Sequence, residues 1–189
     1  NSTGGGCGGV TEQETVQLAS AATCVFGGAH TTRFLSGYVA VCAGALLPER
    51  ERYVRGMFAH ELLHALGFQS LPGSLPGTGP AAVAEAKRIL GCDSVDEVPA
   101  NTGGVHWDLT LVGSQELMAP CIQEHVYISS LTAAAMQDTG RFTVKPPLET
   151  LRDNWQGGKG CIHKLKVCTP GVNCACPGVV LNSAAGEGD

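Results

Sequence analysis

Two histidines and a glutamate lie within five consecutive residues, in the order His60-Glu61-Leu62-Leu63-His64. On a helix, residues four apart lie on one face, so His60 and His64 can direct their imidazoles at one point. Two such imidazoles are two of the three protein ligands of a catalytic zinc ion. Glu61 lies beside that face, where a carboxylate can take a proton from water as the water attacks a carbonyl. The pattern H-E-x-x-H is typical of metalloproteases, and the alternative is an amphipathic helix that carries two histidines by chance.

The residues around this motif predict a helix over residues 48–66. Pro48 is suited to the first helical position, and Glu49 and Glu51 place negative charge in the first turn, where the helix dipole favours it. Gly67 follows where a helix would end in a left-handed residue. We expect an apolar stripe at helical spacing to bury the back of the helix, while the histidine face lines a cleft. The stripe consists of Val54, Phe58, Leu62, Ala65 and Leu66.

A catalytic zinc site needs a third protein ligand, and His106 is the best candidate in the sequence. A turn is expected soon after it, over residues 116–120, and would place Met118 in an apolar environment. Glu85, on the next expected helix, is the alternative ligand and would give a site with two histidines and one glutamate. Gly67 and the segment from His106 to Met118 argue against that alternative. The remaining histidines are His30, His125 and His163.

Further elements are expected on both sides of the histidine helix. Residues 11–22 predict a helix, followed by a turn at Cys24. Residues 37–46 predict a strand, which is either an edge strand able to pair with an extended peptide or an interior strand. Two more helices are expected, over residues 81–90 before Gly91 and over residues 130–138 before Gly140.

Composition limits the class of protein. The chain has 189 residues, about one domain's worth, and a net charge of −5, which argues against a nucleic-acid partner. No apolar run approaches the roughly 20 residues that span a bilayer. Nine cysteines indicate disulfide bonds and an oxidising compartment, with a second, thiolate-bound metal as the alternative. Because nine is odd and the chain starts at Asn1, we expect a processed piece whose missing cysteine lies outside it.

Several segments, taken in order, resemble the leishmanolysin family of metzincin zinc metalloproteases. They are HELLHALGF (residues 60–68), HW (106–107), QELMAP (115–120) and LTAAAMQDTG (131–140). Most metzincins read H-E-x-x-H-x-x-G-x-x-H, with the third histidine directly after the glycine turn. This chain has Ser70 at that position. In the leishmanolysin family an inserted segment displaces the third histidine, which fits residues 68–105 here.

The resemblance implies an α+β, metzincin-like zinc protease fold. It would contain a mixed sheet, an active-site helix, an inserted segment, a Met-turn and disulfide bonds. His60, His64 and His106 would bind one zinc ion, Glu61 would be the catalytic base, and Met118 would be the Met-turn residue. By this resemblance, residues 1–67 end the N-terminal catalytic subdomain, residues 68–140 form the central subdomain, and residues 141–189 begin a cysteine-rich C-terminal domain.

We therefore expect a zinc-dependent endopeptidase that hydrolyses protein or peptide substrates outside the cell or at its surface. Any membrane anchor would be supplied by residues outside this piece. The alternative from another class is a non-catalytic, zinc-containing adhesion or binding module of the cell surface. Glu61 weighs against it, because a structural zinc site has no need of a base at that position.

Overall fold

Three helices of two turns or more and two small antiparallel sheets make up most of the described part of the chain. The computed structural model describes residues 19–26, 33–46, 48, 51–68, 79–100, 105–145, 147 and 179–180. The elements in chain order are β1 (Ala19–Phe26), β2 (Arg33–Val41), η1 (Ala43–Leu46), α1 (Glu51–Ala65), α2 (Pro80–Leu90), α3 (Leu109–Val112), β3 (Cys121–Ile122), α4 (Ser130–Asp138) and β4 (Val179–Val180).

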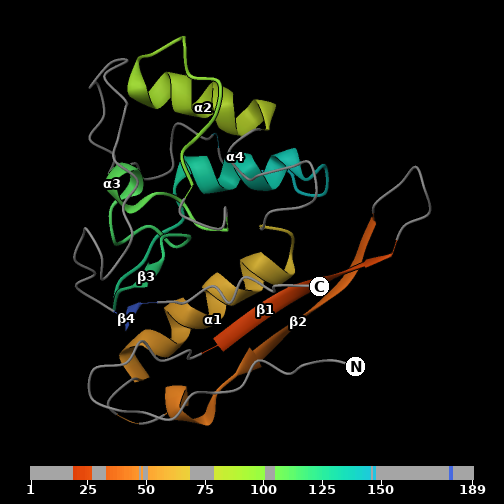
Figure 1. Ribbon diagram of the computed structural model, residues 1–189, viewed down its shortest axis with the longest axis vertical. Helices are drawn as coiled ribbons and strands as arrows, with labels where there is room; N and C mark the ends of the chain where they lie inside the picture. The colour runs from red at the N-terminus through yellow and green to blue at the C-terminus, as the bar shows by residue number, and fades with distance from the viewer. Residues whose placement is uncertain are drawn as a thin grey trace, which may run out of the picture.

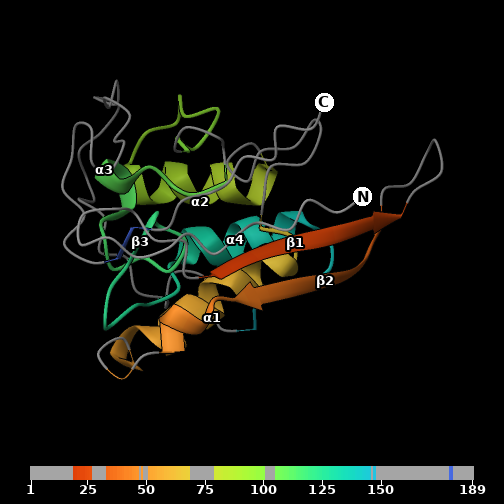
Figure 2. The same ribbon diagram turned by 60° about the horizontal axis from the view of Figure 1, so that its bottom comes forward.

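The helices are stacked, and the hairpin formed by β1 and β2 covers one side of the lowest of them. Two views place α4 between α2 and α1 (Figures 1 and 2). The hairpin packs along α1, while α2 packs on α4. The short elements α3 and β3 lie at one end of this stack (Figure 1). The segment between α2 and α4 contacts the histidine-bearing helix α1 through β3.

The hairpin corrects one of the expected elements. Ala19 pairs with Val41 and Phe26 with Arg33 in an antiparallel ladder, which is irregular between Cys24 and Val25. Residues 19–22, expected to end a helix, are therefore extended, and Cys24 lies in a strand and not in a turn. The rest of that expected helix, residues 11–18, lies outside the described residues. Pairing with a second strand outweighs the helix propensity of alanine, which is a weak preference.

The expected strand over residues 37–46 is only partly correct. β2 begins earlier, at Arg33, and ends at Val41, after which residues 43–46 turn into a 3-10 helix. The other small sheet pairs Cys121 with Val180, so a strand from the cysteine-rich end of the chain joins the central segment. In the described ranges both sheets are antiparallel and two-stranded, so the mixed sheet that we expected is wrong for this part of the chain.

The three main helices form where the sequence predicted them, with α1 shorter than expected at its start. α2 begins at Pro80 and ends at Gly91, which has a left-handed φ of 63°. α4 begins after Ser129, whose side chain accepts a hydrogen bond from the Thr132 backbone N–H. It closes before Gly140, whose φ is 71°. These helices form where capping residues and glycines mark the ends.

The buried face of α1 is not the one that the apolar stripe predicted. Phe58, Leu62 and Leu66 are 49%, 43% and 37% exposed. The helix instead buries the face that carries Gly56, Met57, His60, Glu61 and His64. Both faces have helical spacing, so spacing could not distinguish them. The histidine face is buried because it packs toward the central segment, which brings polar partners for its imidazoles.

Gly56 allows that close packing. A Cβ at this position would lie 3.1 Å from Val126 Cγ2, so the Val126 side chain would have to move by a few tenths of an ångström. The main apolar core lies beyond it, among α2, α4 and the segment that carries Trp107 and Met118, both of which are fully buried. The candidate metal ligands thus lie where α1 meets the segment that carries Trp107 and Met118.

None of the helices in the described ranges is long and apolar enough to cross a membrane.

Asp138, at the end of α4, holds the start of α2. Its two carboxylate oxygens accept hydrogen bonds from the backbone N–H groups of Ala81 and Ala82, each at 2.8 Å. These N–H groups belong to the first turn of α2, where the helix itself offers no acceptor. We expect Asp138→Ala to lower the free energy of unfolding by about 1 kcal/mol, because both donors lose their partner. Asp138→Asn keeps one acceptor, so its free energy of unfolding should lie between those of the unaltered protein and of Asp138→Ala. Urea unfolding measures all three.

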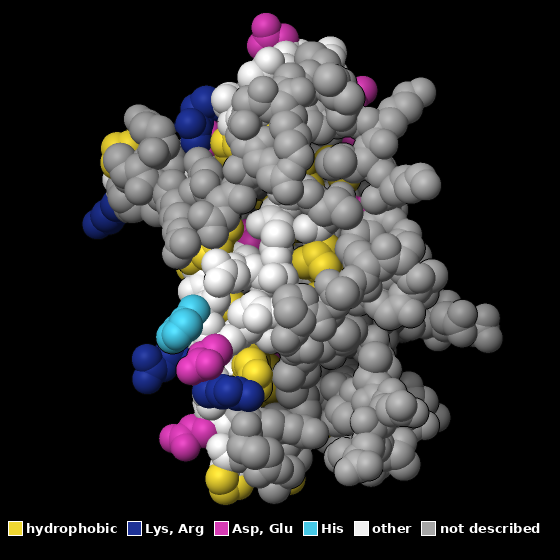
Figure 3. All heavy atoms as spheres, turned by 90° about the vertical axis from the view of Figure 1, so that its left-hand side faces the viewer, with side chains coloured by type: hydrophobic (Ala, Val, Ile, Leu, Met, Phe, Trp, Pro, Cys, Tyr) yellow, Lys and Arg dark blue, Asp and Glu magenta, His cyan; other side chains and the backbone are white. Residues whose placement is uncertain are grey.

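Glu124→Ala is the matched control for this prediction. Glu124 is paired with Arg52 at 3.9 Å, with side chains 51% and 58% exposed. Figure 3 shows charged side chains of both signs close together on one face of the molecule. An exposed pair of this kind contributes little, so we expect a loss below about 0.5 kcal/mol. If Asp138→Ala cost no more than Glu124→Ala, the cap would not stabilise the contact between α2 and α4.

Candidate metal centre

The site begins with two imidazoles on one face of α1. His60 and His64 are one helical turn apart, and their Nε2 atoms lie 3.0 Å from each other. Both residues are buried, at 0% and 8% exposure. The spacing of four residues therefore brings the two rings together as the sequence predicted.

The third imidazole comes from a distant part of the chain. His106 lies just before α3, and its Nε2 is 3.0 Å from that of His60 and 3.2 Å from that of His64. It is 3% exposed. Among the described residues, these three form a group whose ligand atoms lie close enough to bind one metal ion. The prediction that His106 joins the two helix histidines is confirmed.

The hydrogen bonds at the far side of two rings define their tautomers. His60 Nδ1 lies 2.5 Å from the Leu117 carbonyl oxygen, and His64 Nδ1 lies 2.5 Å from the Phe68 carbonyl oxygen. A carbonyl oxygen can only accept, so each Nδ1 must carry the proton. A neutral imidazole has a single N–H, so the Nε2 of each ring is unprotonated. Their lone pairs therefore face each other, an arrangement that a cation bound between them would stabilise.

Burial disfavours an extra proton as that cation. Desolvation lowers the pKa of His60 to about 3; neighbouring His64 lowers it further, and the hydrogen bond to Leu117 opposes the shift. Desolvation also lowers the pKa of His64, and lowers that of His106 well below its ordinary value. All three rings are thus neutral near pH 7, the form that binds metals.

The spacing of the three nitrogens fits a metal ion. Nitrogens bound tetrahedrally to zinc at about 2.0–2.1 Å lie roughly 3.3 Å apart. The observed separations are 3.0 to 3.2 Å. The carbonyls of Leu117 and Phe68 also match the outer contacts of metal-bound histidines, which usually donate their second N–H to a carbonyl or carboxylate. The donor set therefore fits a single ion.

The turn after α1 supplies one of these carbonyls. Gly67 has a φ of 118°, and its N–H donates to the His64 carbonyl at 3.0 Å. The N–H of Phe68 reaches back to the Leu63 carbonyl at 2.9 Å, which completes a Schellman-type end. This turn directs the Phe68 carbonyl toward the His64 ring. The Phe68 ring also contacts Trp107 edge-on, with centroids 5.0 Å apart, and so ties the helix end to the neighbour of His106.

Glu61 is the carboxylate nearest in sequence to the histidines. It is 5% exposed, and burial raises its pKa to about 7. In the described ranges its side chain makes no hydrogen bond or ion pair that would compensate for the loss of water. The group can therefore exchange a proton near neutral pH.

Met118 lies in the turn that faces His60. Its side chain is fully buried in the apolar core, and its carbonyl accepts a hydrogen bond from the Trp107 N–H at 3.0 Å. The preceding residue, Leu117, provides the acceptor for His60. The expected turn thus contributes a backbone acceptor to the centre.

Glu85, the alternative third ligand, has another partner. Its carboxylate pairs with Arg88 at 2.6 Å on α2. Burial would raise the pKa of Glu85, but hydrogen bonds from Arg88 and Ser130 outweigh it, so the pKa is lowered. Glu85 is not a member of the histidine group. The site with two histidines and a glutamate is therefore wrong for this structure.

Glu116 is a buried polar residue that the sequence reasoning missed. It is fully buried, directly precedes Leu117, and accepts hydrogen bonds from Met118, Ser129 and Thr132. Burial raises the pKa of Glu116, and these hydrogen bonds oppose that shift. The sequence signal for this role was an acid inside an otherwise apolar turn. A buried acid needs hydrogen-bond partners, so its position there indicates a network.

A comparison of the sequence with models of known protein families gave no match.

Gly67→Ala should weaken metal binding more than it weakens folding. A side chain at a φ of 118° is strained, so we expect a loss of at least about 1 kcal/mol in the free energy of unfolding. The altered turn would also displace the Phe68 carbonyl from His64, and loss of such an outer contact costs roughly 10- to 100-fold in metal affinity. Zinc affinity can be measured by competition with a chromophoric chelator.

Gly91→Ala is the control, because Gly91 also ends a helix at positive φ but lies at the end of α2. We expect a similar loss of stability and an unchanged zinc affinity. Equal zinc affinities for the two variants would contradict the role of the Gly67 turn.

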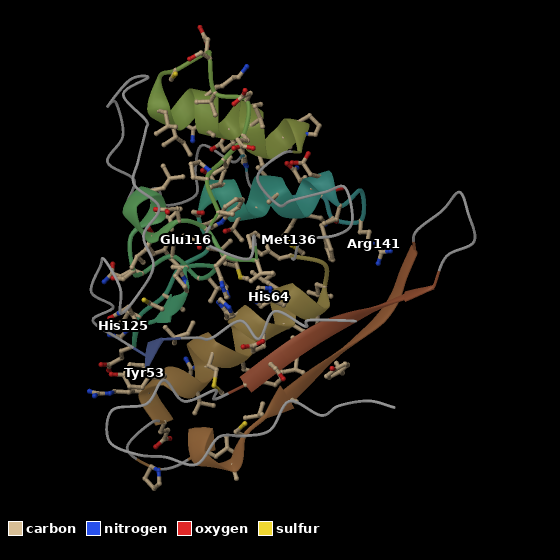
Figure 4. All side chains as sticks on the ribbon, in the orientation of Figure 1. Tyr53, His64, Glu116, His125, Met136 and Arg141 are labelled. Atoms are coloured by element: carbon tan, nitrogen blue, oxygen red, sulfur yellow. The ribbon has the colours of Figure 1, made fainter. Side chains whose placement is uncertain are left out.

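His106→Ala should abolish stoichiometric zinc binding, since two imidazoles alone hold the ion weakly. His125→Ala should retain it. His125 is exposed and lies at the edge of the molecule, whereas His64 points to the interior between α1 and α4 (Figure 4). Zinc content after dialysis of both variants checks this. Loss of zinc from the His125 variant, or its retention in the His106 variant, would show that the ligand set is wrong.

Proposed function

We propose that this chain is a zinc-dependent endopeptidase of the leishmanolysin type. The observation that carries the proposal is the convergence of three buried, neutral imidazole nitrogens from two separate segments. The order of the motifs supports the family, since His60, Glu61 and His64 precede the inserted segment and His106 and Met118 follow it. By this proposal the fold is metzincin-like.

Zinc is the proposed ion because three imidazoles in near-tetrahedral spacing, with one position left for water or substrate, are the donor set of catalytic zinc sites. His60, His64 and His106 would hold it. Zinc in such a site supplies a Lewis acid for the scissile carbonyl and for water.

Glu61 is proposed as the general base. It follows His60 directly on α1 and is held at 5% exposure, with no ion pair among the described residues. Its carboxylate would take a proton from the attacking water at one Oε atom and return it to the leaving amine. Met118 is proposed as the Met-turn residue, which supports the ligands from within the core.

A non-catalytic module of the cell surface is the second candidate function. The observation that favours it is the burial of the ligands, since His60 is fully buried and His106 is 3% exposed. Structural zinc sites are closed in this way, but they have four protein ligands. The group here has three among the described residues, and a buried glutamate, Glu61, directly follows His60 in the sequence. These two features favour the enzyme.

An extracellular or cell-surface location completes the proposal. Its support is the cysteine content of the chain, since nine cysteines in 189 residues favour disulfide bonds. Disulfides persist mainly in secreted and surface proteins, which fits an oxidising compartment. Protein or peptide substrates fit that location.

Glu61→Gln should retain zinc and lose peptide hydrolysis. The amide has nearly the same shape but cannot accept the proton, so we expect kcat/KM to fall at least about 100-fold. The measurement is cleavage of an unfolded protein such as casein, together with the zinc content of each preparation. Glu51→Gln, an exposed acid in the first turn of the same helix, is the matched control and should cleave normally.

Two outcomes would contradict the enzyme. Cleavage by Glu61→Gln within tenfold of the unaltered protein would mean that Glu61 is not the base. Zinc binding by the unaltered protein without any cleavage would instead favour the non-catalytic module.

A further inference from the structure

Glu116 is a buried carboxylate in the turn that faces the metal centre, and four donors converge on it. Its Oε2 accepts from the Met118 backbone N–H at 2.5 Å. Its Oε1 accepts from the Ser129 backbone N–H at 3.2 Å, from Ser129 Oγ at 2.9 Å and from Thr132 Oγ1 at 2.6 Å. A carboxylate that accepts this many bonds holds both its own turn and the start of α4 in place.

The bond from Thr132 continues to the neighbour of His106. The indole Nε1–H of Trp107 donates to Thr132 Oγ1 at 2.8 Å. Because an indole can only donate, Thr132 must accept there and give its own hydroxyl hydrogen to Glu116. The chain of hydrogen bonds therefore runs in one direction, from Trp107 through Thr132 to Glu116. Without the Thr132 hydroxyl, the buried indole N–H of Trp107 would have no acceptor.

The two ends of this chain reach two different histidines. At one end, Trp107 follows His106 directly, and its own N–H donates to the Met118 carbonyl at 3.0 Å. At the other end, Glu116 closes the turn whose Leu117 carbonyl accepts from His60 Nδ1. The carboxylate of Glu116 therefore holds two parts of the centre: the segment that carries His106 and the carbonyl that orients His60. Figure 4 shows Glu116 in the interior on the same side of α1 as His64.

We propose that Glu116 and Thr132 are positioning residues of the metal centre, which together hold His106 and the carbonyl acceptor of His60 in the geometry that binds the ion. The inference rests on the proposed metal site, but it does not depend on peptide hydrolysis.

Packing alone does not account for this network. Glu116, Thr132 and Trp107 are each fully buried, and an apolar set of similar volume would pack without any cost of desolvation. A directed chain of hydrogen bonds restricts orientation, which apolar contacts do not do. Outer contacts of this kind typically change metal affinity 10- to 100-fold when they are removed.

The test compares Thr132→Val with Thr132→Ser in the full chain. Valine has nearly the shape of threonine but no hydroxyl, whereas serine keeps the hydroxyl and loses only a methyl group. We expect Thr132→Val to weaken zinc binding at least tenfold, measured by competition with a chromophoric chelator, and Thr132→Ser to remain within about threefold. The visible absorption of bound cobalt(II), used in place of zinc, should change in the valine variant because it reports ligand geometry.

Ile89→Val separates positioning from general stability. Ile89 lies in the same apolar core on α2, which α4 separates from the histidine-bearing helix α1 (Figure 1). This variant should lower the melting temperature of the metal-free protein without changing zinc affinity or the cobalt spectrum. Glu116→Gln is a second variant, because its amide places a donor against at least one of the N–H groups of Met118 and Ser129. It should weaken zinc binding at least as much as Thr132→Val does.

Unchanged zinc affinity in both Thr132→Val and Glu116→Gln would overturn the inference. So would equal weakening by Thr132→Ser or by Ile89→Val, since the effect would then follow core stability. If the proposed protease activity is wrong, the unaltered protein will bind zinc without cleaving casein. The zinc affinities of these variants relative to the unaltered protein still test the role of the network in that case.

Discussion

Three uncharged imidazole nitrogens that point at one another are the feature on which the rest of the structure depends. Two of the rings donate their Nδ1 protons to carbonyls, so their Nε2 lone pairs meet at 3.0 Å with no hydrogen between them. Burial prevents the rings from relieving this by protonation, since it lowers all three pKa values. A bound cation turns the repulsion into attraction, so folding and metal binding are expected to be coupled.

The carbonyls that orient the rings belong to two turns of different construction. Gly67 makes the first turn possible through its backbone conformation, because its φ of 118° is open to glycine. Glu116 makes the second through its side chain, which closes the turn onto the Met118 N–H. One turn is specified locally by a single residue, whereas the other needs α4 to supply Ser129 and Thr132. The aromatic contact between Phe68 and Trp107 joins them.

The two carboxylates near the histidines are buried in different ways. Glu116 is surrounded by donors, so it is held in one orientation and serves structure. For Glu61, desolvation is the one cause of the raised pKa, and in the described part of the chain no donor fixes its oxygens. Environment therefore gives different properties to two side chains with the same functional group, as in other sites that contain two carboxylates.

The sequence alone was enough to predict α1, α2, α4 and the meeting of His60, His64 and His106. Spacing of four residues on a helix, glycines at helix ends and the count of ligands that zinc needs are local or chemical rules. Those rules could not decide which face of α1 is buried, because the apolar stripe of Phe58, Leu62 and Leu66 and the histidine face have the same period. They also could not find the strand that replaces the expected helix at residues 19–22, nor the network around Glu116. Each of these depends on partners distant in the chain, whose hydrogen bonds and packing outweigh local preference only once the tertiary structure has brought them together.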